Sequence, residues 1–287
     1  MNNKFEITID ARVNLNFTNS EVLELNEKIG RQKKLDSINY LLKQADDMRK
    51  KKLARTIKPV PTLKECLKPL VVHASDCHKL MTNPQRKSDE LSETTKTWLK
   101  EKAVERILGL RKKVATKPMM KGILCEPKAI ELYNMMNTSE LKKNCETKEQ
   151  NGFCGTPDLI GKDTIVEIKT SWDASTFPFF QEDVEKALKK AGYDWQCRVY
   201  MMLFGINKAE VCYCLIDTPK TTPSGIRLLN EWDDMSIHSF HGIVPEHKRI
   251  SISEVIERDD AIEQKMLERY NVANRFYQNY LEEIYNK

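Results

Sequence analysis

The sequence predicts a mixed α/β fold of the α+β type, in which a central mixed sheet is flanked by helices. Apolar residues recur at helical spacing in three segments: 91–110, 121–136 and 193–205. Three other segments read as strands: 151–161, 163–171 and 208–219. A turn at Gly161-Lys162-Asp163 joins the first two strands, so the order is helix, hairpin, helix and strand.

Single residues set the expected helix boundaries. Ser92 is a suitable N-cap for the helix over residues 91–110. Pro127 either kinks the helix over residues 121–136 or marks a new first turn at Glu126. Ser75 is expected to cap a short helix over residues 76–82.

The chain divides into a core over residues 61–225 and two extensions. Residues 1–60 are expected to be a strand and a helical basic extension that ends in a cluster of cations: Arg49, Lys50, Lys51, Lys52, Arg55 and Lys58. This cluster is either a solvated helix end or a contact for the DNA backbone. Residues 226–287 are expected to be a loop and a long helix over 252–287, which packs on the core or in an oligomer interface.

Composition indicates a soluble globular protein. Of the 287 residues, 40% are hydrophobic and 31% are charged, and the net charge is +5. No apolar run reaches the ~18 residues of a membrane span. The N-terminus lacks the apolar segment of a signal peptide, so a cytoplasmic protein with no membrane contact is expected.

The cysteines and histidines do not indicate a zinc site. None of the eight cysteines forms a CxxC pair, so buried reduced thiols are expected, with Cys212 and Cys214 on one face of a strand. His73 and His78 are not at helical i, i+4 spacing, which favours packing or a phosphate contact over metal binding.

Asp158, Glu167 and Lys169 place three charges in an otherwise apolar stretch. Side chains on a strand alternate between faces, so Glu167 and Lys169 point the same way, and Asp158 reaches that face across the hairpin. The apolar neighbours indicate a central strand: Leu159, Ile160, Ile165, Val166 and Ile168. A salt-bridge trio on a solvated face is the alternative. The apolar flanks favour a site for a hard divalent cation, because buried like charges need a neutralising partner.

A cation held there would stabilise charge on a phosphate and lower the pKa of its bound water. A lysine beside it, with its own pKa depressed, would take the proton from the attacking water.

The arrangement resembles the PD-(D/E)xK nuclease superfamily. Pro157-Asp158 followed by Glu167-Ile168-Lys169 matches the signature. A helix carrying Glu126 before it and a helix carrying Gln196 after it resemble the branch of phage lambda exonuclease and the YqaJ-like viral recombinases. Three blocks extend this similarity: residues 71–88, 121–133 and 191–205. The resemblance covers roughly residues 65–220 and implies a restriction-endonuclease-like core.

The resemblance implies roles for the matching residues. Asp158 would hold the main Mg²⁺ ion or bridge two, and Glu167 with the backbone carbonyl of Ile168 would complete the first site. Glu126 would serve a second metal ion. Lys169 would orient or deprotonate the attacking water, and Gln196 would hold that water or Lys169.

A pocket for a 5′-terminal phosphate is also implied, with Lys68, Ser75 and Thr156 in matching positions and His78 and Arg198 as further DNA contacts. Lys68 stands where the family has an arginine, so bidentate phosphate binding is lost. Arg198 stands where the family has a second glutamine and either contacts DNA or caps the site electrostatically. These departures bear on cleavage polarity more than on metal chemistry.

The expected function is a Mg²⁺-dependent exonuclease, with Mn²⁺ able to substitute, that resects ends of duplex DNA, 5′ to 3′, for phage-type recombination. The resemblance implies a single-strand annealing recombinase as partner, a ring-shaped homo-oligomer, and a phage- or prophage-encoded protein in a bacterial cytoplasm. No clustered cysteines follow Gln196, so no iron–sulfur cluster is expected. The alternatives are an endonuclease or a RecB-like single-strand nuclease on the same core, and a non-catalytic DNA-end-binding module. The last should have lost one of Asp158, Glu167 and Lys169, and all three are present.

One aromatic segment has two interpretations. Trp172 follows the charged strand and precedes Phe177, Phe179 and Phe180. These residues form either a wedge that stacks on bases or a hydrophobic loop that packs on the core.

Overall fold

The computed structural model of the chain describes residues 67–110 and 115–286. The predicted N-terminal extension over residues 1–60, with its basic cluster, lies outside the described residues. The described part contains helices and two sheets, which confirms the predicted α+β class.

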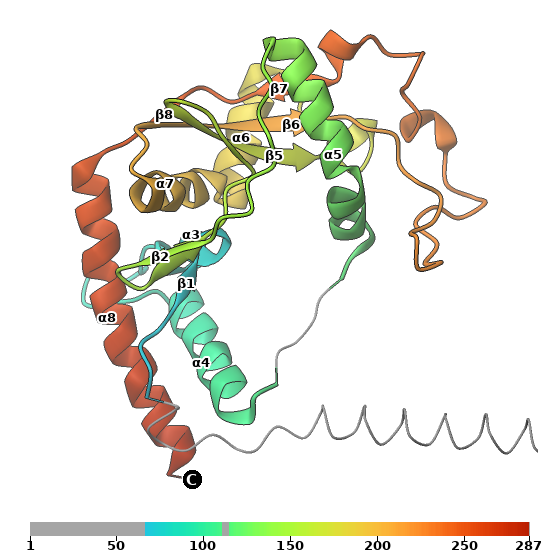
Figure 1. Cartoon of the computed structure of the whole chain (residues 1–287). Coiled ribbons are helices and arrows are strands. Elements are labelled where there is room, and N and C mark those ends of the chain that lie inside the picture. The colour runs from blue at the N-terminus through green and yellow to red at the C-terminus, as the bar shows by residue number, and fades with distance from the viewer. Residues whose placement is uncertain (1–66, 111–114, 287) are drawn as a thin grey trace, which may run out of the picture. The chain divides into compact units, whose positions relative to one another are not determined.

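The helices and strands follow one another from the N-terminal to the C-terminal side (Figure 1). The helices are α3 (Cys77–Leu80), α4 (Glu93–Leu108), α5 (Lys117–Asn137), α6 (Gln181–Ala191), α7 (Tyr193–Phe204) and α8 (Asp260–Tyr285). The strands are β1 (Val72–His73), β2 (Lys148–Gln150), β3 (Phe153–Gly155), β4 (Leu159–Ile160), β5 (Thr164–Thr170), β6 (Lys208–Cys214), β7 (Ile250–Ile252) and β8 (Ile256–Glu257). Short 3-10 turns lie at Ala74–Asp76, Ala174–Thr176, Met235–Ile237 and Glu246–Lys248.

The larger sheet has the order β4-β5-β6-β7, with β8 also paired to β6. β4 and β5 form the predicted antiparallel hairpin, and the N–H of Gly161 donates to the Thr164 carbonyl across its turn. β5 and β6 run parallel, with Glu167 opposite Val211. The sheet is therefore mixed, as predicted.

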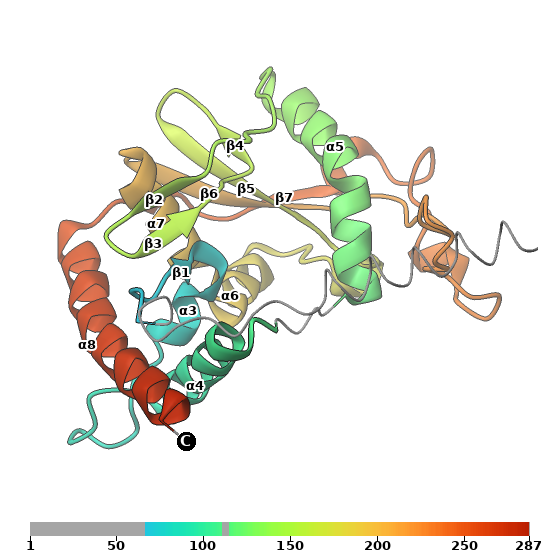
Figure 2. The ribbon, with the colours of Figure 1, turned by 60° about the horizontal axis from the view of Figure 1, so that its bottom comes forward.

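The two faces of this sheet are covered by different helices (Figures 1 and 2). Val166 and Ile168 of β5 pack with α5 residues such as Ala129. Ile165 and Val211 face the other way, into the larger core that includes α7. Because side chains alternate along a strand, Glu167 and Lys169 lie on the α7 side.

The residues predicted as one strand over 151–161 are divided between two sheets. β3 pairs with β1 and β2 in a small three-stranded sheet, whereas β4 belongs to the larger sheet. Pro157 lies between them and has no N–H to donate to a ladder, which separates the two strands.

The predicted caps hold for one helix and fail for another. The Ser92 hydroxyl accepts a hydrogen bond from the Thr95 N–H and caps α4, as predicted. Ser75 does not cap a helix over residues 76–82. It lies in a 3-10 turn, and α3 is a helix of four residues whose N-cap, Asp76, makes no side-chain cap bond.

The helix that carries Glu126 is longer than predicted. It begins at Lys117, where the Thr116 hydroxyl accepts from the Met119 N–H, and continues through Pro127 to Asn137. Pro127 therefore does not begin a separate helix. Packing of Cys125 and Ala129 against the sheet holds both sides of the proline in one helix.

The C-terminal helix begins at Asp260, not at residue 252. The residues before it form β7 and β8, because their isoleucines pair with the edges of β6. The Asp259 carboxylate accepts from the N–H groups of Ala261 and Ile262 and caps the helix. The apolar residues of this segment fit helical and strand spacing equally, so spacing alone did not separate them.

The apolar face of α8 is buried within the chain. It packs alongside α4 (Figure 2), and its buried residues join the larger core: Met266, Ala273, Tyr277 and Leu281. Of the two predicted roles for this helix, the structure therefore displays packing on the core.

Six of the seven described cysteines are buried, as predicted, and Cys145 is exposed. Cys212 and Cys214 share a face of β6, with 3.6 Å between their sulfur atoms. None of the helices in the described ranges is long and apolar enough to span a bilayer.

Truncation of Leu281 tests the packing of α8. Leu281 is fully buried, so Leu281→Ala should lower the free energy of unfolding by about 2–5 kcal/mol in urea titrations. Tyr285→Ala is the control, because Tyr285 is 40% exposed and its removal should change little. Equal effects of the two substitutions would contradict this packing.

Candidate active site

The β4–β5 hairpin brings Asp158 and Glu167 together. Asp158 directly precedes β4, and its Oδ2 accepts a hydrogen bond of 2.8 Å from the Ile168 N–H on β5. Both carboxylates belong to buried residues, with Asp158 8% and Glu167 4% exposed. Two acidic side chains therefore lie side by side within the sheet.

Lys169 and Gln196 surround the Glu167 carboxylate. The Lys169 ammonium donates to Glu167 Oε1 at 2.8 Å, and the Gln196 amide donates to the same oxygen at 2.8 Å. The Gln196 amide also donates to the hydroxyl of Tyr200, one turn further along α7. The helix predicted to carry Gln196 thus fixes Glu167 from the α7 side of the sheet.

Tyr193 lies beside Lys169. The Lys169 ammonium sits 4.2 Å from the centre of the Tyr193 ring, within the range of a cation–π contact. Sequence reasoning placed Tyr193 and Tyr200 in the Gln196 helix but assigned neither a role. Their helical spacing from Gln196 was the available signal.

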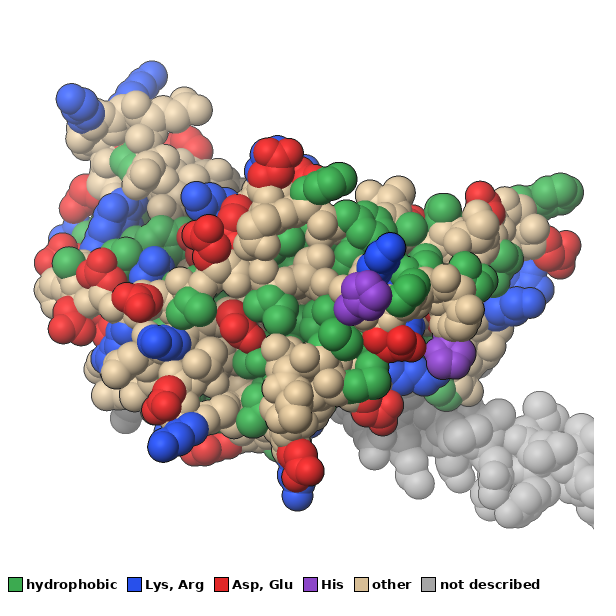
Figure 3. Space-filling model, turned by 90° about the horizontal axis from the view of Figure 1, so that it is seen from above, with side chains coloured by type: hydrophobic (Ala, Val, Ile, Leu, Met, Phe, Trp, Pro, Cys, Tyr) green, Lys and Arg blue, Asp and Glu red, His purple; other side chains and the backbone are tan. Residues whose placement is uncertain are grey.

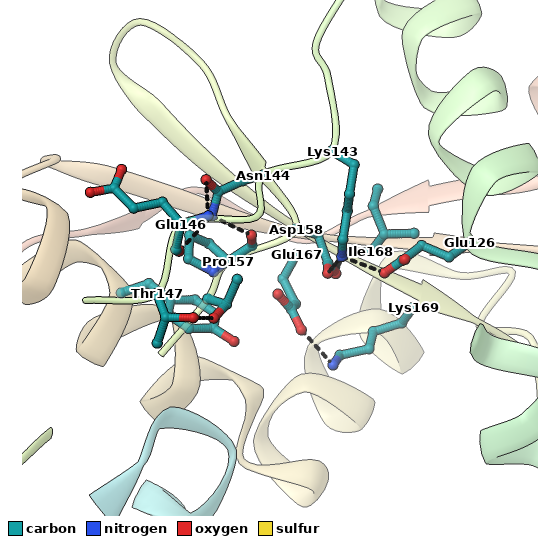
Figure 4. Close-up of polar contacts among 12 residues, drawn as sticks. Glu126, Lys143, Asn144, Glu146, Thr147, Pro157, Asp158, Glu167, Ile168 and Lys169 are labelled. Atoms are coloured by element: carbon teal, nitrogen blue, oxygen red, sulfur yellow. Dashed lines mark hydrogen bonds and ion pairs between the residues drawn. The ribbon is translucent and has the colours of Figure 1, made fainter. Parts of the chain in front are cut away.

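A second lysine joins the two remaining carboxylates. Lys143 Nζ lies 2.6 Å from Glu126 Oε1 and 2.5 Å from Asp158 Oδ1. Figure 4 shows the ammonium between these carboxylates, with Glu126 reaching in from α5. The structure therefore joins all five predicted catalytic residues in one network, together with Lys143, which sequence reasoning missed.

The backbone around Lys143 explains its position. Lys143 forms an isolated antiparallel bridge with Leu159, and the Asn144 N–H donates to the Asp158 carbonyl at 2.8 Å. The segment thus lies along the free edge of β4. It has no strand pattern, and Lys143 follows another lysine, so the sequence gave no signal for it.

Burial and neighbouring charges shift the pKa values here. Burial raises the pKa of Glu167 to about 7; the Lys169 ammonium opposes this shift and the Asp158 carboxylate adds to it. Burial would lower the pKa of Lys143, but its hydrogen bonds to Asp158 and Glu126 outweigh burial and raise it.

The expected depression of the Lys169 pKa is wrong for this structure. Burial would lower that pKa, but the Glu167 carboxylate, with further contributions from Tyr193 and Asp158, raises it above its usual range. Lys169 is therefore a stable ammonium while the carboxylates beside it are charged.

The donor atoms suit a hard divalent cation. Asp158, Glu167 and Glu126 offer carboxylate oxygens, and Glu167 Oε2 is buried without a hydrogen-bond partner among the described residues. As these side chains stand, no three His, Cys, Asp or Glu residues of the described ranges are gathered closely enough to hold a metal ion. The reason is visible in Figure 4, where Lys143 lies between Glu126 and Asp158.

The predicted phosphate-binding residues are more dispersed. Thr156 lies next to Pro157, and its hydroxyl is 2.7 Å from that of Thr147. Ser75 is exposed in the turn before α3, next to Ala74, whose Cβ would lie 3.1 Å from a Cβ added at Gly155. Ser75 and Thr156 thus flank one close approach between chain segments.

The other three residues have separate surroundings. The His78 ring contacts the Ser75 carbonyl at 2.9 Å. Lys68 is exposed and lines a cavity of about 770 Å³ beside α8. Arg198 is directed toward the Glu257 carbonyl on β8, at 3.4 Å.

Two further surfaces bear on DNA binding. Phe177 is buried, whereas Phe179 and Phe180 are 52% and 69% exposed, so the aromatic segment both packs on the core and presents rings to solvent. Acidic and basic side chains are interspersed on the face seen in Figure 3. That face therefore has no single large basic patch.

The chain shares its fold with two solved exonucleases. A phage related exonuclease from Haemophilus somnus is 29% identical over 77% of this chain and 99% of its own, with a TM-score of 0.70. An alkaline exonuclease from Laribacter hongkongensis is 16% identical over 75% of this chain and 92% of its own, with a TM-score of 0.51, a likeness of fold alone.

No protein-family model and no curated protein matches the sequence. The likeness to the Haemophilus exonuclease confirms the predicted resemblance to the lambda exonuclease branch and the predicted nuclease class.

The Glu167 carboxyl group should titrate far above its usual range in metal-free protein. Its pKa should lie near 7 rather than near the 4.5 of an unperturbed glutamate, because burial favours the neutral acid. Addition of Mg²⁺ should lower this pKa, because a nearby cation favours the carboxylate. Carbon-13 NMR of labelled glutamate side chains, assigned with Glu167→Gln, measures both values. A metal-free pKa near 4.5 would contradict the burial of this group.

Proposed function

We propose that this chain, a nuclease by its similarity to solved exonucleases, is a metal-dependent deoxyribonuclease that resects the ends of linear duplex DNA. The buried pair Asp158 and Glu167 beside Lys169 is the observation that carries the proposal. Two carboxylates at this depth need a positive partner, and a phosphodiester hydrolase needs such a charge at the scissile phosphate.

The side chains suit a site for Mg²⁺ or Mn²⁺. Asp158, Glu167 and the Ile168 carbonyl would hold the first ion, and Glu126 would serve a second. The bound ions would supply charge stabilisation at the phosphate and a water of lowered pKa. The unpartnered Oε2 of Glu167 and the all-oxygen donor set support this assignment.

Lys169 would orient the attacking water and accept its proton. Glu167 and the Tyr193 ring hold the Lys169 ammonium in place. The Glu167 charge raises the pKa of Lys169, so neutralising that carboxylate removes the main obstacle to its role as a base. Gln196 would keep Glu167 oriented through the hydrogen bond they share.

Cleavage from the 5′ end follows from the family resemblance and is part of the proposal. Ser75, His78 and Thr156 would receive a terminal phosphate, with Lys68 adding charge and Arg198 contacting DNA further away. The exposed strand would pass to a single-strand annealing recombinase, and a ring-shaped oligomer would enclose the duplex.

Labelled linear DNA tests this function. Duplexes carrying a label at either the 5′ or the 3′ end are incubated with protein and Mg²⁺ or Mn²⁺, and a covalently closed circle is the control substrate. The 5′-labelled strand should disappear progressively while the circle stays intact. Lys169→Ala should reduce the rate by about 10²–10⁴-fold. Lys162→Ala, which removes an exposed lysine from the β4–β5 turn, should leave the rate unchanged.

Other outcomes would separate the alternatives. Nicking of the circle would indicate an endonuclease on the same core. Loss of the 3′ label first would contradict the proposed polarity but not the chemistry. Tight binding to DNA ends without cleavage in either metal would leave only a binding module.

A further inference from the structure

Lys143 occupies the position that a cation would take between Glu126 and Asp158. Its ammonium lies within hydrogen-bonding distance of both carboxylates, at 2.6 Å and 2.5 Å. No catalytic role follows for it from the resemblance. The contact nevertheless involves two of the three carboxylates that the proposed metal sites require.

The position of Lys143 is fixed by the backbone. Its bridge to Leu159 and the hydrogen bond from the Asn144 N–H to the Asp158 carbonyl tie this segment to the edge of β4. The Asn144 side-chain amide also donates to the Pro157 carbonyl at 3.1 Å. These bonds hold the lysine on the same short segment as the carboxylate that it neutralises.

The charges around the site explain what Lys143 does there. Glu126, Asp158 and Glu167 bring three negative charges, Lys169 offsets one of them at Glu167, and Lys143 offsets the other two in part. An ammonium and a divalent cation repel each other strongly at a separation of a few ångströms. Both cannot lie between Glu126 and Asp158.

The side chain has a path out of this position. The Lys143 side chain is 37% exposed, against 12% for Asp158. It can therefore rotate into solvent while the carboxylates remain in place. Leaving requires only the loss of its two ion pairs, because its backbone bonds do not involve the side chain.

We propose that Lys143 is an internal competitor of the metal: it holds Glu126 and Asp158 together while no metal is bound, and it must leave before a divalent ion binds between them. The inference rests on the proposed metal-dependent function. Lys143 is thus a positioning residue that sets the threshold metal concentration. Removal of its charge should tighten metal binding and should weaken the metal-free fold.

Mn²⁺ binding in the absence of DNA measures this competition. The free Mn²⁺ signal in electron paramagnetic resonance gives the Kd for wild-type protein, Lys143→Gln and Lys143→Arg. Lys142→Gln is the matched control, because it removes an exposed lysine next to Lys143. Lys143→Gln should lower the Kd roughly ten-fold or more, because a competing charge is removed. Lys143→Arg, which keeps the charge, and Lys142→Gln should stay within about two-fold of wild type.

Thermal unfolding supplies a second measurement. Without metal, Lys143→Gln should unfold at a lower temperature than wild type, because Glu126 and Asp158 then repel each other. Saturating Mn²⁺ should raise its Tm by more than it raises that of the wild type. Circular dichroism at low temperature checks that each variant is folded.

The outcomes distinguish this inference from the function on which it rests. An unchanged or higher Kd in Lys143→Gln, with wild-type binding that is lost in Asp158→Asn, would overturn the role of Lys143 and leave the metal site intact. If the folded wild type bound no Mn²⁺, or if Asp158→Asn bound it as well as wild type, the proposed metal site would fail and this inference with it.

Discussion

Buried carboxylates that need a positive partner are the constraint on which this structure depends. Asp158 and Glu167 lie within a sheet whose other side chains are largely apolar. Moving such charges out of water is costly unless cations or hydrogen-bond donors compensate for them. The elements around the sheet supply these partners: the β5 backbone and Lys143 for Asp158, and Lys169 with Gln196 for Glu167.

The two-sided packing of the sheet makes this compensation possible. α5 covers one face with apolar residues and presents Glu126 at the sheet edge. α7 covers the other face and presents Gln196 and Tyr200 to Glu167. Gly155 allows β3 to approach α7 closely, since an added Cβ there would lie 2.6 Å from a Tyr200 ring atom. A rigid frame therefore holds charged groups whose mutual repulsion a bound cation would relieve.

Local pattern was enough to predict part of this arrangement. Alternation along the hairpin placed Glu167 and Lys169 on one face and Asp158 beside them, and Ser92 marked the start of α4. Features that depend on distant pairing were not predictable. Lys143 gains its role only because its segment lies along β4, and β7 and β8 are strands only because β6 offers them edges. The raised pKa of Lys169 likewise depends on how close Glu167 lies in the folded chain.

Anomalous diffraction from crystals soaked in Mn²⁺ tests the central claim most directly, because it locates the ion without reference to activity. The account predicts a peak within coordination distance of side-chain oxygens of both Asp158 and Glu167, with the Lys143 ammonium turned away from Glu126. A peak at other residues, or no peak with Lys143 still between Glu126 and Asp158, would contradict the proposal that this carboxylate pair is a metal-dependent catalytic centre.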